Sequence, residues 1–205
     1  MPVEVLGRAP TGDGPRAAPR GPEFRRVAVD DPLVEPLLRE LAEEYVRRYG
    51  PQARQELTRY PGEAFTEPHG GVLLLLLEDG EPVAGGAYKR YDDRTAEVKR
   101  MWTHSAHRRR GLARRVLAEL ERTAAAAGYA RIYLTTGPRQ PEARGLYLAA
   151  GYTPLFDLAA DPLTIGPLPF EKPLPVEGAP SVEEAPPVEG APTADPAPPA
   201  PPAPH

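Results

Sequence analysis

The sequence predicts an α/β domain between two ends of different composition. Strand-like and helix-like patterns alternate through residues 23–172, and residues 111–128 carry the strongest amphipathic helix pattern. Both ends are rich in proline and show no hydrophobic periodicity. A chain of 205 residues suits one domain with tails, so we expect a single folded domain over residues 23–172.

The two ends are predicted to be disordered arms. Residues 1–22 are rich in Gly, Pro and Arg. Residues 173–205 contain twelve prolines, five acidic residues, no Lys or Arg, and the degenerate repeat VEGAP, VEEAP, VEGAP. Proline removes backbone donors and favours polyproline II geometry, and so little apolar surface cannot offset the entropy of ordering. We therefore expect residues 173–205 to form an extended acidic tail.

The composition excludes several classes of protein. The chain is net −4, and residues 1–172 are net +1 because the tail holds five acids and no base, whereas a generic nucleic-acid-binding domain is strongly basic. The absence of cysteine excludes disulfides, zinc–thiolate sites and cysteine nucleophiles, and it fits a cytoplasmic protein. Residues 1–22 lack the apolar run of a secretory signal. The leucine run 73–77 is too short for a membrane helix and indicates a strand buried on both faces.

The elements of the domain can be placed in order from periodicity and turn signals. Leu37, Leu38, Leu41 and Tyr45 share one face of a helix, Asp79-Gly80 is a hairpin signal, and Gly128 is suited to cap the end of a helix. The prolines near residue 170 favour an edge strand. Strands are expected at 24–29, 72–78, 81–91, 94–103, 130–136 and 167–174, and helices at 33–48, 51–59, 111–128 and 141–151.

A cluster of five arginines between Arg108 and Arg115 surrounds Gly111, at the start of the predicted helix 111–128. A helix N-terminus has unpaired N–H groups and a positive dipole end, which together bind phosphate. The small residues Gly111 and Ala113 would let a diphosphate approach the backbone, and arginines add charge-assisted hydrogen bonds. We interpret the cluster as an oligophosphate site; a solvated helix face and a nucleic-acid patch are the alternatives.

Three motifs in this part of the chain resemble a known family. RRRGLA, residues 108–113, fits the pattern Arg/Gln-x-x-Gly-x-Gly/Ala, and it follows the strand AEVKRMWT. Downstream, QPEARGLYLAAGY is similar to the signature Asn-x-x-Ala-x-x-Leu-Tyr-x-x-x-Gly-Phe/Tyr, except that Gln140 stands where Asn is usual. Together they resemble the GNAT superfamily of N-acetyltransferases. The likeness extends over residues 23–172 in element order and is sharpest over residues 97–152.

The resemblance implies a fold and a cosubstrate site. The fold would be a mixed central sheet, mostly antiparallel, with one splayed pair of parallel strands and helices on both faces. The backbone of the last residues of the strand 94–103 would pair with the pantetheine arm of acetyl-CoA, and the arginine-rich loop would bind its pyrophosphate. The implied cofactor-binding residues are Met101, Trp102, Thr103, Arg108, Arg109, Arg110, Gly111, Leu112, Ala113, Arg114 and Gln140.

The resemblance also implies two catalytic candidates. Tyr147, in the Leu-Tyr signature, would protonate the departing thiolate; the alternative is a core aromatic residue. Glu97 would be the base that deprotonates the amine; the alternative is a carboxylate paired with a nearby Lys or Arg, and both remain open. The four histidines have no metal-ligand spacing, so no metal is expected.

The functional hypothesis is an N-acetyltransferase that moves the acetyl group of acetyl-CoA to a primary amine by direct attack. The acceptor would be a small-molecule or peptide amine, with no nucleic acid and no membrane, and the protein would be a monomer or homodimer. The alternatives are a non-catalytic CoA-binding regulatory module and a nucleic-acid-binding protein that uses the arginine cluster. Several aromatic residues could line an acceptor pocket or belong to the core: Tyr45, Tyr49, Tyr60, Tyr88, Tyr91 and Phe156.

Overall fold

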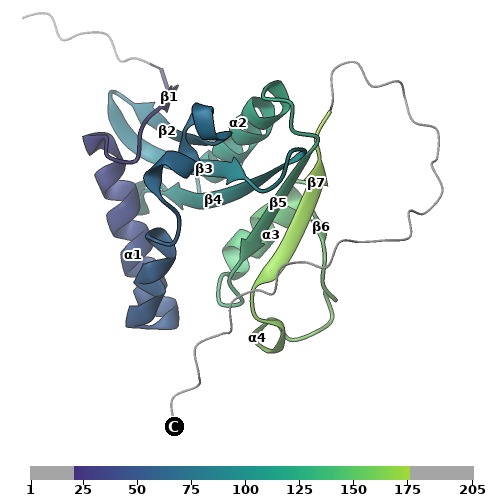
Figure 1. The fold of residues 1–205 in the computed structure, drawn as a ribbon. Coiled ribbons are helices and arrows are strands. Elements are labelled where there is room, and N and C mark those ends of the chain that lie inside the picture. Colours follow the sequence, from purple (N-terminus) through teal and green to yellow (C-terminus); the bar gives the residue numbers. More distant parts are fainter. Residues whose placement is uncertain (1–20, 176–205) are drawn as a thin grey trace, which may run out of the picture.

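The computed structural model describes residues 21–175, which form a seven-stranded sheet with helices on both faces (Figure 1). Of the arms expected at residues 1–22 and 173–205, residues 1–20 and 176–205 lie outside the described residues. The strands are β1 (Glu23–Arg26), β2 (Val72–Glu78), β3 (Glu81–Arg90), β4 (Thr95–Thr103), β5 (Arg131–Thr136), β6 (Thr153–Pro154) and β7 (Leu168–Pro173). The α-helices are α1 (Glu35–Tyr49), α2 (Leu112–Ala126), α3 (Pro141–Ala149) and α4 (Pro162–Ile165). Short 3-10 helices are η1 (Pro32–Val34), η2 (Pro51–Leu57), η3 (Gly62–Phe65), η4 (Glu67–His69) and η5 (Ser105–His107).

The strand order β1-β2-β3-β4-β5-β7-β6 contains one parallel pair, β4 with β5, and every other neighbouring pair is antiparallel. This arrangement confirms the predicted mixed sheet. The parallel ladder begins at Thr95↔Arg131 and ends at Val98↔Leu134, although β4 continues to Thr103. Beyond that point β4 pairs only with β3 and β5 only with β7 among the described residues, so the two strands diverge (Figure 1). We call the interval between their diverging backbones the opening.

A β-bulge lies in β4 where this opening begins. The pair Ala87↔Lys99 is followed by Gly85↔Trp102, so Arg100 and Met101 stand opposite the single residue Gly86. Arg100 adopts the left-handed conformation, with φ 56°. A Cβ on Gly86 would lie 2.8 Å from the sulfur of Met101, so a larger residue there would have to displace that side chain. Because of the extra residue, the side chains of Lys99 and Arg100 both point to the α1 side of the sheet, where they contact Tyr60 and Phe65.

The two faces of the sheet have separate cores, which explains the uninterrupted apolar run in β2. Leu73, Leu75 and Leu77 pack with α1 and η3, whereas Leu74 and Leu76 pack with α2 on the other face. The prediction that this strand is buried on both faces is confirmed. No helix within residues 21–175 is long and apolar enough to cross a membrane.

The end of the domain differs from two expectations. The strand expected at the sheet edge, β7, lies between β5 and the two-residue β6, which is the outer strand instead. The prolines of β7 are tolerated because its outer partner, β6, has only two residues and pairs with few backbone N–H groups of β7. The strand also runs one residue past Lys172, where we placed the domain boundary, and the following Leu174 is only 6 % exposed. The N–H of Leu174 donates to the carbonyl of Ala130 at 2.8 Å.

One helix also differs in type from its expectation. The α-helix expected at residues 51–59 is the 3-10 helix η2.

Candidate functional site

The loop between β4 and α2 presents unpaired backbone N–H groups. Gly111 precedes the helix in the left-handed conformation, with φ 74°, and Arg115 N donates to its carbonyl at 3.2 Å. That bond is the first of the helix, so Leu112, Ala113 and Arg114 have no intrahelical partner for their N–H groups. A Cβ built on Gly111 would meet no atom within 4 Å, so the backbone is open to a ligand on this side. This is the geometry that the sequence predicted for a phosphate site.

The arginine side chains of the loop divide into two groups. Arg108 Nη2 lies 3.2 Å from Glu44 Oε2 of α1, and Arg110 makes a bidentate pair with Glu78 of β2, both distances 2.9 Å. Among the ion pairs within residues 21–175, none involves Arg109 or Arg114. The charges of Arg108 and Arg110 are therefore paired with carboxylates of the protein, whereas those of Arg109 and Arg114 are available to a ligand. Leu112 is buried, so only its backbone can reach a ligand.

The end of β4 offers backbone rather than side chains to the opening. Met101 packs into the core under α2, and Trp102 Nε1 donates to Glu40 Oε2 at 3.0 Å on the other face. Thr103 pairs with Ala84 of β3. On the side facing β5 the described residues supply no strand partner beyond Val98, so the backbone groups of residues 99–103 line the opening. The use of main-chain groups of Met101, Trp102 and Thr103 by a cosubstrate stays a prediction.

Gln140 holds the turn that leads from β5 into α3. Its Oε1 accepts a hydrogen bond from Gly137 N at 3.0 Å, and its Nε2 lies 3.5 Å from Glu44 Oε1. The side chain expected to contact cofactor is thus engaged with the protein itself. Since Glu44 also pairs with Arg108, the amide belongs to one network with the arginine loop.

The end of α1 contacts the start of α3 across the opening, which the sequence did not suggest. Arg139 N donates to Tyr49 Oη at 3.1 Å, and Arg139 Nη1 donates to the carbonyl of Arg48 at 2.9 Å. Arg48 also pairs with Glu142 and, at 3.2 Å, with Glu44. The partners are about ninety residues apart in the chain, and no local pattern marks such contacts.

Tyr147 of α3 is buried in the core between the sheet and the helices α2 and α3. Its ring centroid lies 5.7 Å from that of Tyr152 and 5.6 Å from that of Phe170. Burial raises the pKa of Tyr147 well above its usual value, and the proximity of Tyr45 on α1 adds to the effect. Its hydroxyl is therefore neutral at physiological pH and carries a proton. The ring serves the core, and the hydroxyl stays a candidate for the predicted acid.

Glu97 is held between two lysines on the α1 face of the sheet. It is 5 % exposed, and its carboxylate oxygens lie 2.8 Å from Lys89 Nζ of β3 and 2.8 Å from Lys99 Nζ. Burial by itself would raise the pKa of Glu97, but Lys99 and Lys89 outweigh it and hold the pKa below its usual value. A carboxylate of low pKa is a poor proton acceptor. Of the two roles left open for Glu97, its contacts favour the paired carboxylate.

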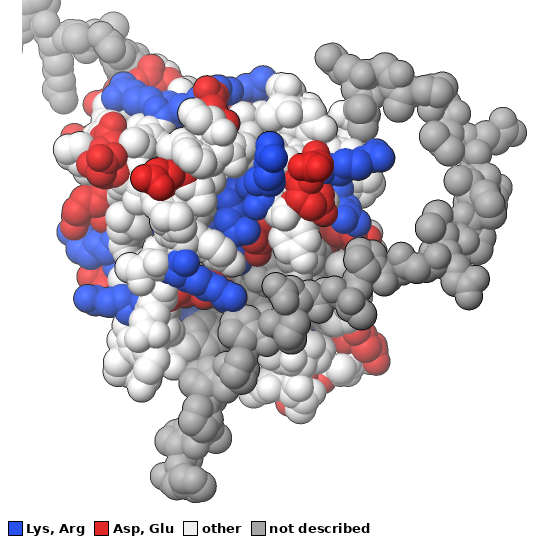
Figure 2. Space-filling model, in the orientation of Figure 1, with Lys and Arg blue, Asp and Glu red and all other residues white. Residues whose placement is uncertain are grey.

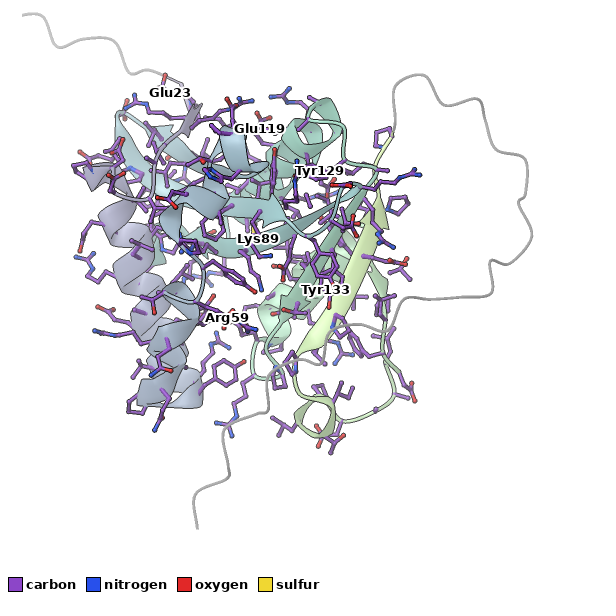
Figure 3. All side chains as sticks on the ribbon, in the orientation of Figure 1. Glu23, Arg59, Lys89, Glu119, Tyr129 and Tyr133 are labelled. Carbon is purple, nitrogen blue, oxygen red and sulfur yellow. The ribbon has the colours of Figure 1, made fainter. Side chains whose placement is uncertain are left out.

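Aromatic rings surround this charged group. Lys89 Nζ lies 4.5 Å and Lys99 Nζ lies 5.5 Å from the ring centroid of Tyr60, and the rings of Tyr91 and Tyr133 are 5.1 Å apart. Figure 3 shows Lys89 and Tyr133 on the near face of the sheet, with Arg59 on the segment beside them. Of the expected pocket aromatics, Tyr60 and Tyr91 lie here, whereas Tyr88 and Phe156 belong to the core under α2 and α3.

The chain is similar to known proteins in sequence. The model of the acetyltransferase (GNAT) family matches residues 34–152. An uncharacterized N-acetyltransferase of Bacillus subtilis, YsnE, is 37 % identical over 93 residues, which cover 42 % of this chain and 62 % of that protein. The chain therefore spans less than two thirds of this relative's length.

Solved structures give the same fold. A candidate acyl-CoA N-acyltransferase of Klebsiella pneumoniae is 27 % identical, with a TM-score of 0.58 over 75 % of this chain and 97 % of that one. YncA of Salmonella typhimurium, a candidate acetyltransferase solved with acetyl-CoA, is 16 % identical, with a TM-score of 0.58 over 79 % and 99 % of the two chains. The PaiA N-acetyltransferase of Thermoplasma acidophilum, solved with coenzyme A, is 16 % identical, with a TM-score of 0.59 over 75 % and 99 %.

The matched residues 34–152 are more than half of the chain, and they contain the arginine loop, the diverging strands β4 and β5, and Tyr147 of α3. The chain belongs to the acetyltransferase (GNAT) family.

Proposed function

We propose that the protein transfers the acetyl group of acetyl-CoA to a primary amine. The observation that carries this proposal is the opening between β4 and β5, which begins beside Lys99. The chain continues from this part of β4 to the unpaired N–H groups at the start of α2. A ligand with a diphosphate at one end and an extended polar arm at the other fits both parts.

The cosubstrate is assigned to the arginine loop and the free edge of β4. The N–H groups of residues 111–114 receive the diphosphate, with Arg108, Arg109, Arg110 and Arg114 around it. The pantetheine arm lies along Met101, Trp102 and Thr103 and hydrogen-bonds to the backbone as an added strand. The relatives from Salmonella and Thermoplasma, solved with acetyl-CoA and coenzyme A, support this assignment for the shared fold.

The transfer proceeds by direct attack. The amine nitrogen bonds to the carbonyl carbon of the thioester, the carbon–sulfur bond breaks, and the acetylated nitrogen gives up a proton to water. The hydroxyl of Tyr147 donates a proton to the departing sulfur and regains one from solvent. The sequence contains no cysteine, so an acetyl group carried on a protein thiol is not part of this route.

Glu97 pairs with Lys89 and Lys99 and does not act as the base in this reaction. An ammonium ion that approaches these cations is destabilised relative to the free amine, because nearby positive charge lowers an amine's pKa. The acceptor therefore reaches the thioester already unprotonated, and its last proton passes to solvent after the attack.

The test is release of CoA from acetyl-CoA by the full-length protein in the presence of a panel of primary amines. Because the chain has no cysteine, a thiol reagent reports released CoA without a protein background. We expect CoA release that depends on the amine. The product should be heavier than the amine by ~42 Da, because one acetyl group replaces one hydrogen. Tight binding of CoA with no release by any amine would support the non-catalytic module instead.

A further inference from the structure

Three cations gather on the α1 face of the sheet where β4 and β5 separate. We call Lys89, Lys99 and Arg100 the cation cluster: the two lysines pair with one buried carboxylate, Glu97, and the buried Arg100 follows Lys99 in β4 with its side chain on the same face. A second carboxylate, on the half-exposed Glu56, lies 3.9 Å from Lys99. Figure 2 shows Lys and Arg side chains gathered in the middle of this face. The cluster thus carries positive charge that its neighbours do not fully neutralise.

Arg100 is the least satisfied member of the cluster. It is only 8 % exposed, its Nη2 donates to the carbonyl of Leu57 at 2.9 Å, and its guanidinium lies 4.1 Å from the ring centroid of Phe65. Its Nη1 is buried and has no hydrogen-bond partner within residues 21–175. No carboxylate of the described residues forms an ion pair with it. A buried guanidinium without a counter-charge is costly, so it indicates an anion that residues 21–175 do not supply.

The lysines keep donors for such an anion. An ammonium group has three N–H donors, and Lys99 uses one for Glu97. Lys89 uses one for Glu97 and one for the carbonyl of Arg90 at 3.3 Å. Both side chains are partly accessible, 14 % for Lys89 and 15 % for Lys99. The ring of Tyr60 lies against both ammonium groups and limits their movement.

The cation cluster lies where an acceptor would have to stand. With the diphosphate at Gly111 and the arm along residues 103 to 101, the reactive end of the cosubstrate reaches the bulge at Arg100. The other face at this point is filled by the core under α2 and α3. The α1 face, with its partly exposed lysines and the neighbouring rings of Tyr91 and Tyr133, is the side left for an amine.

We propose that the cation cluster binds a carboxylate of the acceptor, so that the substrate is an amine that also carries a carboxylate, such as an amino acid. Lys89 and Lys99 contact the carboxylate, and Arg100 supplies the unpaired charge behind them. This inference rests on the proposed acetyl transfer. Polyamines and other polycationic acceptors are disfavoured, because they would bring like charges to the cluster.

The test compares pairs of amines that differ only in the carboxylate. Tyrosine with tyramine, phenylalanine with phenethylamine, and histidine with histamine are assayed for CoA release by the full-length protein with acetyl-CoA. Rates are expressed per concentration of unprotonated amine, because the carboxylate changes the pKa of the amine. We expect kcat/KM to be about 10- to 100-fold higher for the amino acid of a pair, the size of one charge-assisted hydrogen bond.

Variants separate recognition from folding. Lys99→Gln should lower kcat/KM for the amino acid by about 10- to 100-fold more than it lowers kcat/KM for the decarboxylated amine, so the preference within each pair should disappear. Lys99→Arg keeps the charge and should retain the preference. Arg25→Gln removes an exposed cation from β1 at the far edge of the sheet and should change neither rate. Thermal melts of each variant report whether the fold is intact.

Three results would overturn the inference. Equal kcat/KM within every pair, or faster turnover of the decarboxylated amines, would show that the enzyme does not recognise a carboxylate on the acceptor. The proposed acetyl transfer would be unaffected by that result. An equal loss of both rates in folded Lys99→Gln would show that the lysine does not recognise the carboxylate. Failure of every amine to release CoA would overturn the inference together with the proposed function.

Discussion

Arg108 of the arginine loop donates to Glu44 of α1, with Nη2 and Oε2 3.2 Å apart. The pair joins the predicted phosphate site to a helix on the other face of the sheet. Glu44 also contacts Arg48 and Gln140, so one carboxylate lies at the centre of the contacts that close one end of the opening between β4 and β5. A diphosphate that binds at Gly111 would compete with Glu44 for the guanidinium of Arg108.

Removal of that competitor should tighten CoA binding. Glu44→Gln keeps the shape of the side chain and frees Arg108, which is 47 % exposed. Exposed ion pairs contribute about 0.2–1 kcal/mol, so the affinity for CoA should rise by up to about 5-fold. Titration calorimetry measures the change. Glu43→Gln is the control, because Glu43 is exposed and forms no ion pair within the described residues; weaker binding by Glu44→Gln would mean that Glu44 organises the site instead.

Gly111→Asp should abolish CoA binding. The new carboxylate would occupy the open space above Gly111 and repel the diphosphate from the N–H groups of α2. Charge repulsion at close range predicts a loss of affinity of about 100-fold or more. Gly128→Asp is a matched control at the other end of the same helix, since Gly128 also has a positive φ, 92°, and open space. Unchanged affinity in Gly111→Asp would exclude this loop as the diphosphate site.

Tyr147→Phe separates the acid from the core residue. The ring is kept, so packing against Tyr152 and Phe170 should survive. If the hydroxyl protonates the departing thiolate, kcat should fall by roughly 10²–10⁴ while the KM for acetyl-CoA changes little. Tyr152→Phe, in the same cluster, should keep its kcat. Wild-type turnover by a folded Tyr147→Phe enzyme, under conditions where chemistry limits the rate, would leave Tyr147 with a structural role alone.

The raised pKa of Tyr147 also predicts the pH dependence of turnover. Its folded pKa lies above the ordinary value of a tyrosine, so the hydroxyl stays protonated through the neutral and mildly alkaline range. The rate should therefore rise with pH as the acceptor amine loses its proton, with no fall below about pH 10. A descending limb between pH 7 and pH 9 would indicate an acid of lower pKa than Tyr147.

Glu97→Gln should destabilise the fold in a pH-dependent way. The variant leaves Lys89 and Lys99 without their shared counter-charge, and breaking such a buried group costs about 3–5 kcal/mol at neutral pH. Folding lowers the pKa of Glu97, so the stabilisation is present above about pH 4.3, the usual value, and is lost as the pH falls through the folded value. Urea unfolding at several pH values measures the difference. Glu23→Gln, in an exposed pair, is the control; equal stability of Glu97→Gln and wild type at pH 7 would contradict the prediction.

Two truncations test the end of the domain. A chain that ends after Pro175 should keep its melting temperature, because every described residue of β7 and the buried Leu174 remain. A chain that ends after Lys172 loses the side chain of Leu174 and its backbone bond to Ala130, and burial of one leucine contributes about 1.5–3 kcal/mol. Thermal unfolding of both forms measures this. A large loss in the longer form would mean that residues 176–205 contribute to stability.

The sequence by itself determined the order of the elements, the single parallel strand pair implied by the family resemblance, and the arginine-rich loop at the start of a helix. These features depend on local patterns: periodicity marks strands and helices, and residues 108–114 are contiguous at a helix start, where the unpaired N–H groups are a property of any helix. The tertiary structure alone decided the role of Glu97, because Lys89 faces it through the register of two strands. The same holds for Arg100, whose direction depends on a bulge, and for Glu44, which meets Arg108 across sixty-four residues of chain. Charges that neutralise one another across strands are set by register and twist, which a local pattern does not contain.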